Sequence, residues 1–495
     1  MGDFLIEGQY RYVQQPKGLG ELFFDKCDED SSKVAMVYHG VSFTYGDLKK
    51  TTEKLIQTFS DNGIHKGCHV GFCGPNSAGW AASFFALNHL GAVMILFNYK
   101  SVDKELVTTA SSLKLTHLVK IDEEGEPHIS SFPEGEIDKR EHLPVLYFLT
   151  SGSSGTPKLI GATERQLIFS IDAIANMEKM RPGDSCCLVL PLNHIFGLGT
   201  LLPCLMVGVP LYIPASTRSK DVFSCLEGGR CTIINAVPTL MLALAHSEYL
   251  KDFDQSHLRT STIGGASPSK AAMMDIFSAL PGVSFLKLYG SSECAAVAHS
   301  MLDDSVPDIL ESVGKPLSDI SIKIVDPESG QALEKGKPGE IYIKSDYLKY
   351  GDQSIVDGDS YFHTGDLGYL NQKGYLVYLS RKDEMINRAG EKVYPVEIRD
   401  ALSALDGVED AYVYGRNDYF LGDQIVALIE KGNQQLSEAE IKDRLREKLP
   451  SFKIPDRILF YEKFPLLPNG KLDKGKLLSL AEECIKNTEN HPESR

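Results

Sequence analysis

The chain has 495 residues, of which 42% are hydrophobic and 24% are charged, and a formal net charge of −16. This length exceeds what one compact core usually holds, so the sequence predicts a globular protein of at least two domains. The acidic balance argues against nucleic acid as the main partner, because binding a phosphate backbone requires a basic surface. An anionic nucleotide is still compatible with this charge if positive groups and backbone N–H donors gather in one cleft.

The sequence shows no targeting or membrane segment. The N-terminus lacks a basic stretch followed by an apolar run, and the longest apolar stretch, residues 198–213, is interrupted by Pro203, Gly208 and Pro210. The ten cysteines include no C-x-x-C pair and no zinc-finger spacing, so we expect buried, reduced thiols. These features predict a cytoplasmic protein without a transmembrane segment.

The first third of the chain alternates between helical and strand patterns. Residues 45–62 and 78–90 have helical patterns, and residues 69–73 and 92–97 have the apolar composition of buried strands. Strands that alternate with helices predict a parallel sheet covered on both faces. Residues 121–142 are acidic and polar and contain proline, which predicts a solvated connection.

The same alternation continues to about residue 300. Short apolar runs of buried-strand length occur at residues 186–190, 232–236, 260–263 and 285–289. Helical segments lie between them, at residues 239–246 and 269–280.

The texture changes twice in the last third. Residues 312–379 contain period-two strands and Gly/Asp turns, which predict a smaller β-rich subdomain. After Arg381 a short α+β module begins, with helices expected near residues 395–405 and 437–449.

A glycine-rich loop gives the strongest local signal. An apolar strand at residues 146–149 leads into Thr150-Ser151-Gly152-Ser153-Ser154-Gly155-Thr156-Pro157-Lys158. Glycines let backbone N–H groups turn toward an anion, hydroxyls add donors, and the lysine adds charge. The Walker A spacing is absent. Taken alone, the loop is equally compatible with phosphate binding and with a Ser/Gly-rich surface hairpin.

Further motifs follow in a defined order. They are Tyr289-Gly290-Ser291-Ser292-Glu293, Tyr361-Phe362-His363-Thr364-Gly365-Asp366, Arg381-Lys382-Asp383-Glu384, Gly390-Glu391-Lys392-Val393-Tyr394-Pro395 and Pro468-Asn469-Gly470-Lys471. Each one alone could be a turn or a helix cap, but their joint occurrence in this order has no such explanation.

In this set and order the chain resembles the acyl-CoA synthetase, luciferase and peptide-synthetase adenylation-domain superfamily, and within it the acyl- or aryl-CoA ligases. The resemblance runs from Phe43 to Lys471. It implies an α/β fold, with a large N-terminal domain (residues 1–380) of two doubly wound sheets and a β-barrel-like subdomain. It also implies a hinge at residues 381–383, centred on Asp383, and a small mobile α+β C-terminal domain (residues 384–495).

The resemblance implies a two-step reaction. A carboxylate attacks the α-phosphate of ATP, pyrophosphate leaves, and a thiol then displaces AMP from the acyl-adenylate. The first step joins two anions, so the site must supply positive charge and hydrogen-bond donors. The expected cofactors are therefore ATP, Mg²⁺ and coenzyme A, or a carrier-protein phosphopantetheine in place of coenzyme A.

The family motifs assign roles to particular residues. The catalytic groups would be Lys471, Ser292, Lys158 and His194, and Glu293 would hold Mg²⁺. The residues expected to bind ATP or AMP are Thr150, Ser151, Gly152, Ser153, Ser154, Gly155, Thr156, Lys158, Gly264, Gly265, Ala266, Tyr289, Gly290, Ser291, Ser292, Asp366, Arg381 and Lys471.

The acid and the acceptor channel follow from the same motifs. No acidic residue occurs in residues 195–200, where members that activate amino acids carry an Asp, so we expect an acid without an α-amino group. Gly290 replaces the Trp of acetate-activating members, which suggests a deeper apolar pocket. The acyl pocket would comprise His194, Ile195, Gly264, Gly290 and Cys294, and the pantetheine channel Ala389, Gly390 and Glu391.

Some positions depart from the family pattern, and some questions stay open. The departures are Leu159, Glu164, Asn387 and Ala389. Coenzyme A is the expected acceptor, a carrier protein is the alternative, and oxidation of the adenylate as in luciferases is a remote third. A different kind of function is a nucleotide-binding protein without catalytic activity. The presence of the expected catalytic and binding residues argues against it, namely Lys158, Glu293, Asp366, Arg381 and Lys471. The expected assembly is a monomer or a homodimer.

Overall fold

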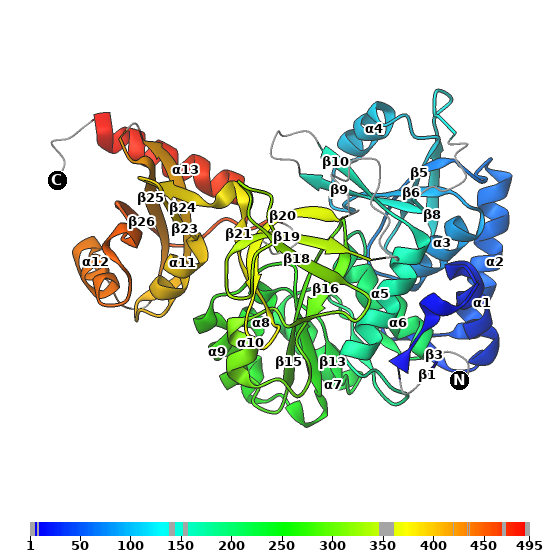
Figure 1. The fold of residues 1–495 in the computed structure, drawn as a ribbon. Coiled ribbons are helices and arrows are strands. Elements are labelled where there is room, and N and C mark those ends of the chain that lie inside the picture. The colour runs from blue at the N-terminus through cyan, green and yellow to red at the C-terminus, as the bar shows by residue number, and fades with distance from the viewer. Residues whose placement is uncertain are drawn as a thin grey trace.

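The computed structural model describes residues 5–6, 9–137, 144–151, 157–345, 361–418, 420–432, 434, 436–467 and 472–490. Among these residues, no helix has both the length and the hydropathy needed to cross a bilayer. The described parts form several sheets covered by helices, as the α/β prediction requires (Figure 1).

A six-stranded sheet forms in the N-terminal part of the chain, in the order β10-β9-β6-β5-β7-β8. Its four inner strands are parallel to one another and its two edge strands are antiparallel to their neighbours. The strands are β5 (His69–Cys73), β6 (Val93–Leu96), β7 (His117–Ile121), β8 (Pro127–Ser131), β9 (Leu146–Ser151) and β10 (Pro157–Ala162).

Strand β8 corrects one expectation. The sequence predicted a solvated connection over residues 121–142, but Pro127–Ser131 pairs with β7 along its length. An edge strand has one free side, so it tolerates a proline at its start and polar side chains throughout. This polar composition hid the strand from a pattern search that relies on apolar residues.

The second sheet has nine strands, in the order β17-β16-β15-β14-β13-β11-β12-β3-β4. Strands from β15 through β3 in this order run parallel, so their carboxyl ends lie on one edge, where ligands bind in open α/β sheets. The strands are β3 (Val34–Tyr38), β4 (Val41–Thr44), β11 (Cys186–Cys187), β12 (Leu211–Ile213), β13 (Ile233–Ile234), β14 (Thr260–Ile263), β15 (Ser284–Ser291), β16 (Ala295–His299) and β17 (Lys315–Pro316).

Helices α5 and α6 pack against each other between the two sheets, and the main core contains residues of both helices and both sheets (Figure 1). Helices α3 and α6 are apolar nearly all round, as helices enclosed by other elements are. The helices of this part are α1 (Leu19–Glu29), α2 (Tyr45–Asp61), α3 (Ala78–His89), α4 (Asp103–Ser112), α5 (Glu164–Met177), α6 (Ile195–Val207), α7 (Ser219–Gly228), α8 (Pro238–Ala245), α9 (Lys270–Ala279) and α10 (Val306–Glu311).

An antiparallel sheet of four strands occupies the place of the expected β-rich subdomain. It comprises β18 (Ser321–Val325), β19 (Gly339–Lys344), β20 (Phe362–Leu370) and β21 (Leu376–Arg381). Over the described residues it is an open sheet.

The C-terminal part has its own sheet and its own hydrophobic core, and it lies to one side of the larger part (Figure 1). Its elements are β22 (Ile386–Arg388), β23 (Glu391–Val393), α11 (Pro395–Ser403), β24 (Val408–Asp418), β25 (Gly422–Lys431), α12 (Glu438–Arg446), β26 (Arg457–Tyr461) and α13 (Lys474–Asn490).

Candidate active site

A buried carboxylate stands at the centre of the candidate nucleotide site. The pairing of β20 with β21 places Asp366 directly opposite Arg381, and Arg381 Nη1 lies 2.9 Å from Asp366 Oδ1. The Tyr289 hydroxyl, from β15, donates to Asp366 Oδ2 at 2.6 Å. Burial raises the pKa of Asp366 even though Tyr289 and Arg381 act to lower it. The structure therefore brings together three residues that the motifs placed far apart in sequence.

The backbone around Asp366 holds its side chain in place. The Asp366 N–H donates to Thr364 Oγ1 at 3.0 Å, and this hydroxyl donates to the Ile341 carbonyl at 2.7 Å. Gly365 between them has a φ of +70°, a conformation that favours glycine. Each carboxylate oxygen has two lone pairs, so Asp366 retains capacity to accept from the hydroxyls of a ribose.

The Gly264-Gly265-Ala266 segment leaves β14 at the carboxyl edge of the nine-stranded sheet. Gly265 has a φ of +79°, and a Cβ added to Gly264 would lie 3.2 Å from the ring of Phe196. The backbone therefore approaches the first turn of α6 closely, which leaves little room for a side chain at this point. This contact joins the expected nucleotide segment to the expected acyl pocket.

A small apolar cavity of about 70 Å³ lies beside this segment. Of the predicted pocket residues, Ile195 and Gly290 line it. Its full lining is Ser170, Ile174, Ile195, Phe196, Gly199, Gly265, Leu288, Gly290, Ser291, Ala295 and Ala296. The motifs did not point to Ser170 and Ile174, which share one face of α5 through their four-residue spacing. The helical periodicity of residues 164–177 was the signal that could have found them.

Gly290 has a different reason for being glycine than the one expected. A Cβ added there would lie 1.9 Å from the Ala295 carbonyl oxygen, at an irregularity in the pairing of β15 with β16. This close approach requires glycine whatever the length of the pocket, so Gly290 alone does not indicate a deep pocket. Gly199 is the open position instead, because a Cβ added there meets nothing within 4 Å.

His194 and Cys294 lie elsewhere than in this cavity. His194 directly precedes α6, makes no side-chain capping bond to it, and lines a second, larger cavity of about 440 Å³. Cys294 is buried, and its sulfur lies 3.0 Å from Ser291 Oγ. These two residues and Gly264 do not line the small cavity, and their acyl-pocket roles stay predictions.

The larger cavity lies between the strand ends of both sheets. Its walls include Lys100, His39 and His194, together with Leu466 and Leu467 from the C-terminal part. Asn76 ties the wall together, because its side chain donates to the Leu190 carbonyl at 2.8 Å and accepts from the Leu192 N–H at 3.1 Å.

Glu293, the predicted magnesium ligand, lies between β15 and β16. Gln166 of α5 donates to the Glu293 carbonyl at 3.3 Å, and the charge of Glu293 contributes to the raised pKa of Asp366, so the two carboxylates share one region. Within the described ranges, no group of three or more His, Cys, Asp or Glu side chains could hold a metal ion. A single carboxylate fits Mg²⁺, which usually takes one or two protein carboxylates and completes its shell with phosphates and water.

Two predicted elements fall outside the described residues. Gly152, Ser153, Ser154, Gly155 and Thr156 belong to the undescribed part of the glycine-rich loop, and Lys471 lies beyond β26 in another undescribed stretch. The flanking strands are paired, with Lys158 opposite Thr150 across the β9–β10 hairpin. The roles of these residues stay predictions.

The predicted hinge and channel residues lie at the start of the C-terminal part. Asp383 is exposed in a short 3₁₀ turn, Lys382–Glu384, that joins β21 of one sheet to β22 of another. Ala389 and Gly390 form the two-residue turn before Glu391, with φ values of +51° and +88°. A two-residue hairpin turn with both φ values positive favours Gly, Asn or Asp, so the turn itself explains Gly390, whereas Ala389 takes a conformation that alanine rarely adopts.

Glu164, which departs from the family pattern, has a structural role. Its Oε1 accepts from the Leu19 N–H at 2.9 Å at the start of α1. The carboxylate therefore satisfies a free donor at a helix N-terminus, where negative charge is favourable.

Comparison with known proteins identifies the family. The model of the AMP-binding enzyme family matches residues 23–351, and the model of the AMP-binding enzyme C-terminal domain matches residues 397–471. The chain belongs to the AMP-binding enzyme family, whose curated members similar to it are acyl-CoA ligases. An acyl-CoA ligase of Ajellomyces capsulatus is 27% identical, with 94% of this chain and 92% of the relative covered. A 2-succinylbenzoate–CoA ligase of Listeria innocua is 26% identical, with 90% and 96% covered.

Solved structures share the fold. MatB from Rhodopseudomonas palustris, solved with ATP bound, superimposes with a TM-score of 0.84 at 21% identity and covers 94% of this chain and 99% of its own. The o-succinylbenzoate CoA synthetase of Bacillus subtilis, in complex with its acyl-adenylate, has a TM-score of 0.79 at 23% identity, with 92% and 97% covered. The predicted fold class, including a separate C-terminal domain, is confirmed.

Proposed function

We propose that this protein is an AMP-forming acid–thiol ligase that converts a compact apolar carboxylic acid and ATP to an acyl-adenylate and then to an acyl-CoA. The observation that carries the proposal is the Tyr289–Asp366–Arg381 cluster next to a small apolar cavity. Leu288 and Gly290, the neighbours of Tyr289 in the chain, both line that cavity. A nucleotide bound at the cluster would have its α-phosphate near an acid bound in the cavity.

The chain's own groups divide the work of the first step. Asp366 accepts from the ribose hydroxyls, Arg381 adds a positive charge beside the ribose and phosphates, and Ser292 donates to the α-phosphate. Lys158 and the glycine-rich loop hold the β- and γ-phosphates, and Lys471 bridges the attacking carboxylate and the α-phosphate. Mg²⁺ held by Glu293 would supply further positive charge at the phosphates.

The apolar cavity favours an acid without charged or strongly polar groups beyond its carboxylate. Over the described residues its wall contains Ile174, Ile195 and Leu288 but no ionisable side chain, so a charged substituent there would lose water without gaining an ionic partner. An α-ammonium group would have no carboxylate to pair with in this lining. The substrate class is therefore a compact aryl or alkyl acid without an α-amino group.

We propose that the larger cavity binds the pantetheine arm of the acyl acceptor. His194 lines it, directly before Ile195 of the small cavity, and its walls contain Lys100 as well as Glu123. A cation there would attract the phosphates of coenzyme A. The phosphopantetheine arm of a carrier protein has only some of these phosphates. A carrier-protein phosphopantetheine is the alternative acceptor.

We further propose that residues 1–380 form the domain that binds acid and ATP, that residues 381–383 form a hinge, and that residues 384–495 form a domain that rotates between the two steps. The passage of the chain from one sheet to another at the Lys382–Glu384 turn supports this division.

The test is pyrophosphate release across a panel of aryl and alkyl acids, measured with and without coenzyme A. We expect release with a subset of acids, and formation of the thioester when coenzyme A is present. Release that never yields a thioester with coenzyme A would point to the carrier protein, and no release with any acid would favour a non-catalytic nucleotide-binding protein.

A further inference from the structure

Three thiols gather at the nine-stranded sheet and the helix α7 beside it, none of them lining either cavity. The Sγ atoms of Cys187, on β11, and Cys225, on α7, lie 3.6 Å apart. The Cys231 sulfur lies 3.8 Å from the Cys225 carbonyl oxygen and is hydrogen-bonded to both other thiols. No C-x-x-C spacing in the sequence indicates this cluster, because Cys187 ends β11, Cys225 lies in α7 and Cys231 precedes β13.

The three thiols differ in exposure and acidity. Cys187 and Cys231 are buried, whereas Cys225 is only partly buried and can be reached from solvent. Hydrogen bonds from Cys187 and Cys231 lower the pKa of the Cys225 thiol, and the hydrogen bond with Cys225 raises the pKa of Cys187. The accessible sulfur thus forms its thiolate most readily of the three, with a buried thiol next to it, which is the arrangement of a reactive and a resolving cysteine.

We propose that the Cys187–Cys225 pair is a site of reversible oxidation, which a hydroperoxide converts to an intramolecular disulfide. The Cys225 thiolate attacks one peroxide oxygen, the O–O bond breaks, and the leaving hydroxide takes up a proton to become water. Cys187 then attacks the Cys225 sulfenic acid, so that the S–S bond forms, the S–O bond breaks and a second water leaves. Overall, two thiols and one hydrogen peroxide give one disulfide and two waters.

The disulfide needs only a modest movement. An S–S bond of about 2.05 Å replaces a sulfur separation of 3.6 Å, and one of the two cysteines sits on the surface helix α7. The link would fasten α7 to β11. Residues 188–191, which follow Cys187, and residues 213–217, which precede α7, both line the larger cavity, so the link would join two of its walls.

The experiment treats the full-length protein with hydrogen peroxide, blocks free thiols, digests with trypsin and analyses the peptides without reduction. We expect residues 221–230, which contain only Cys225, to be joined to residues 180–218 through Cys187, and the link to disappear after dithiothreitol treatment. In the untreated wild-type protein at pH 6, iodoacetamide should alkylate Cys225 about tenfold faster than the more exposed Cys484.

Two variants complete the test. Cys225→Ser should abolish the link, and Cys484→Ser should leave it unchanged. Oxidation of Cys225 to sulfinic acid without any link to Cys187 would overturn the proposal, as would alkylation of Cys484 ahead of Cys225. The alkylation rates need only the wild-type chain, so they decide the matter even if a cysteine variant folds poorly.

Discussion

At the scale of single residues, Asp366 makes the clearest prediction. We expect Asp366→Asn to lower kcat/KM for ATP by about 10- to 100-fold, because a hydrogen bond to a charged group contributes roughly 1.5–3 kcal/mol. Steady-state kinetics of pyrophosphate release would measure this loss. Asp61→Asn, at the exposed end of α2, is the matched control and should leave the kinetics unchanged. Equal values for both variants would remove Asp366 from the nucleotide site.

Gly199 allows a test of the acyl cavity at the same scale. Gly199→Leu would project into the cavity, since a Cβ there meets no other atom, and it should reduce activity on bulky acids while sparing short ones. Gly228→Leu is the control, because Gly228 also lies in a helix with open space at its Cβ but outside the cavity. Pyrophosphate release by both variants would be measured across a panel of acids. An unchanged acid preference for Gly199→Leu would show that this cavity does not bind the acid.

At the scale of elements, α5 connects several parts of the site. Gln166, Ser170 and Ile174 follow one another at four-residue spacing, so the same face holds the Glu293 backbone and lines the acyl cavity. On another face, Asp172 accepts from the Tyr12 and Val13 N–H groups at 2.7 and 3.0 Å, which fixes the N-terminal segment to the helix. Directly after α5 comes a buried carboxyl group, Glu178.

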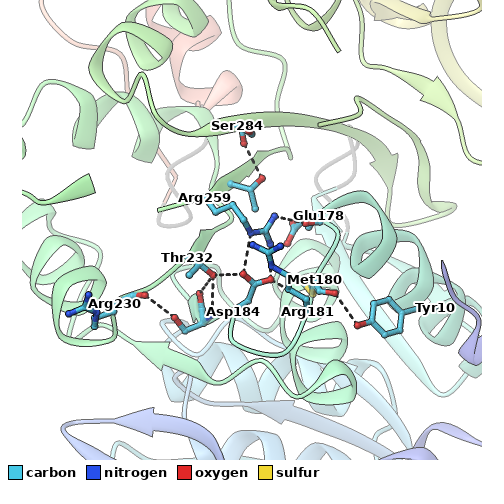
Figure 2. Close-up of polar contacts among 11 residues, drawn as sticks. Tyr10, Glu178, Met180, Arg181, Asp184, Arg230, Thr232, Arg259 and Ser284 are labelled. Atoms are coloured by element: carbon cyan, nitrogen blue, oxygen red, sulfur yellow. Dashed lines mark hydrogen bonds and ion pairs between the residues drawn. The ribbon is translucent and has the colours of Figure 1, made fainter. Parts of the chain in front are cut away.

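Glu178 belongs to a buried polar network. Thr262 donates to its Oε1 at 2.6 Å, and Arg259 donates to its backbone carbonyl at 2.8 Å while forming an ion pair with Asp184 (Figure 2). Burial raises the pKa of Glu178 from 4.5 to about 7. Hydrogen bonds from the Thr262 and Asn235 side chains act to lower the pKa of Glu178, but burial outweighs them.

This raised pKa predicts a pH-dependent stability. Between pH 4.5 and about 7 the folded protein keeps a proton that the unfolded chain has released, so the free energy of unfolding falls as pH rises through this window. Glu178→Gln should remove this contribution, which amounts to up to about 3 kcal/mol. Denaturant unfolding from pH 4.5 to 8 would measure it. Parallel pH profiles for the variant and the wild-type protein would contradict the prediction.

At the scale of the whole molecule, the C-terminal part is joined to the larger part by polar contacts. Arg399 of α11 donates to the Ser267 carbonyl at 2.8 Å, and Lys392 pairs with Glu328 at 2.8 Å. Ser267 directly follows the Gly264–Ala266 segment. Since the C-terminal part has a core of its own, its rotation would break such contacts without exposing either core.

The hinge predicts a separation of the two half-reactions. A 3₁₀ turn has φ values close to the −65° that proline requires, so Asp383→Pro should fold and resist rotation. We expect adenylate formation to survive and thioester formation to collapse. Single-turnover assays of each step, with preformed acyl-adenylate for the second, would show this, and an equal loss of both steps would argue for general damage.

Lys471 predicts the opposite phenotype. Lys471→Ala should lower adenylation by roughly two orders of magnitude, as loss of a transition-state charge donor does. Given preformed acyl-adenylate and coenzyme A, the same variant should form thioester at a rate near that of the wild-type protein. If this variant damages both steps equally, or neither, the alternation of the domains between the two steps is wrong for this protein.

The sequence alone determined the family, the order of the domains and most buried elements. β5 and β14 have the bounds that the apolar runs predicted, and α2 differs only at its end. The bounds of helices and strands depend on residues that are close in the chain, through hydrophobic periodicity and helix caps, so a local stretch of sequence is enough to predict them. The motifs also named Asp366 and Arg381, which the pairing of β20 with β21 brings into contact, and their role in nucleotide binding stays a prediction.

Only the tertiary structure decided how side chains from distant segments meet. It made β8 an edge strand, turned His194 toward the larger cavity, and explained Gly290 through its approach to the Ala295 carbonyl. It also added Ser170 and Ile174 to the acyl cavity. These contacts depend on the distances between elements, which the packing of the folded chain fixes. A local pattern of residues does not predict such distances.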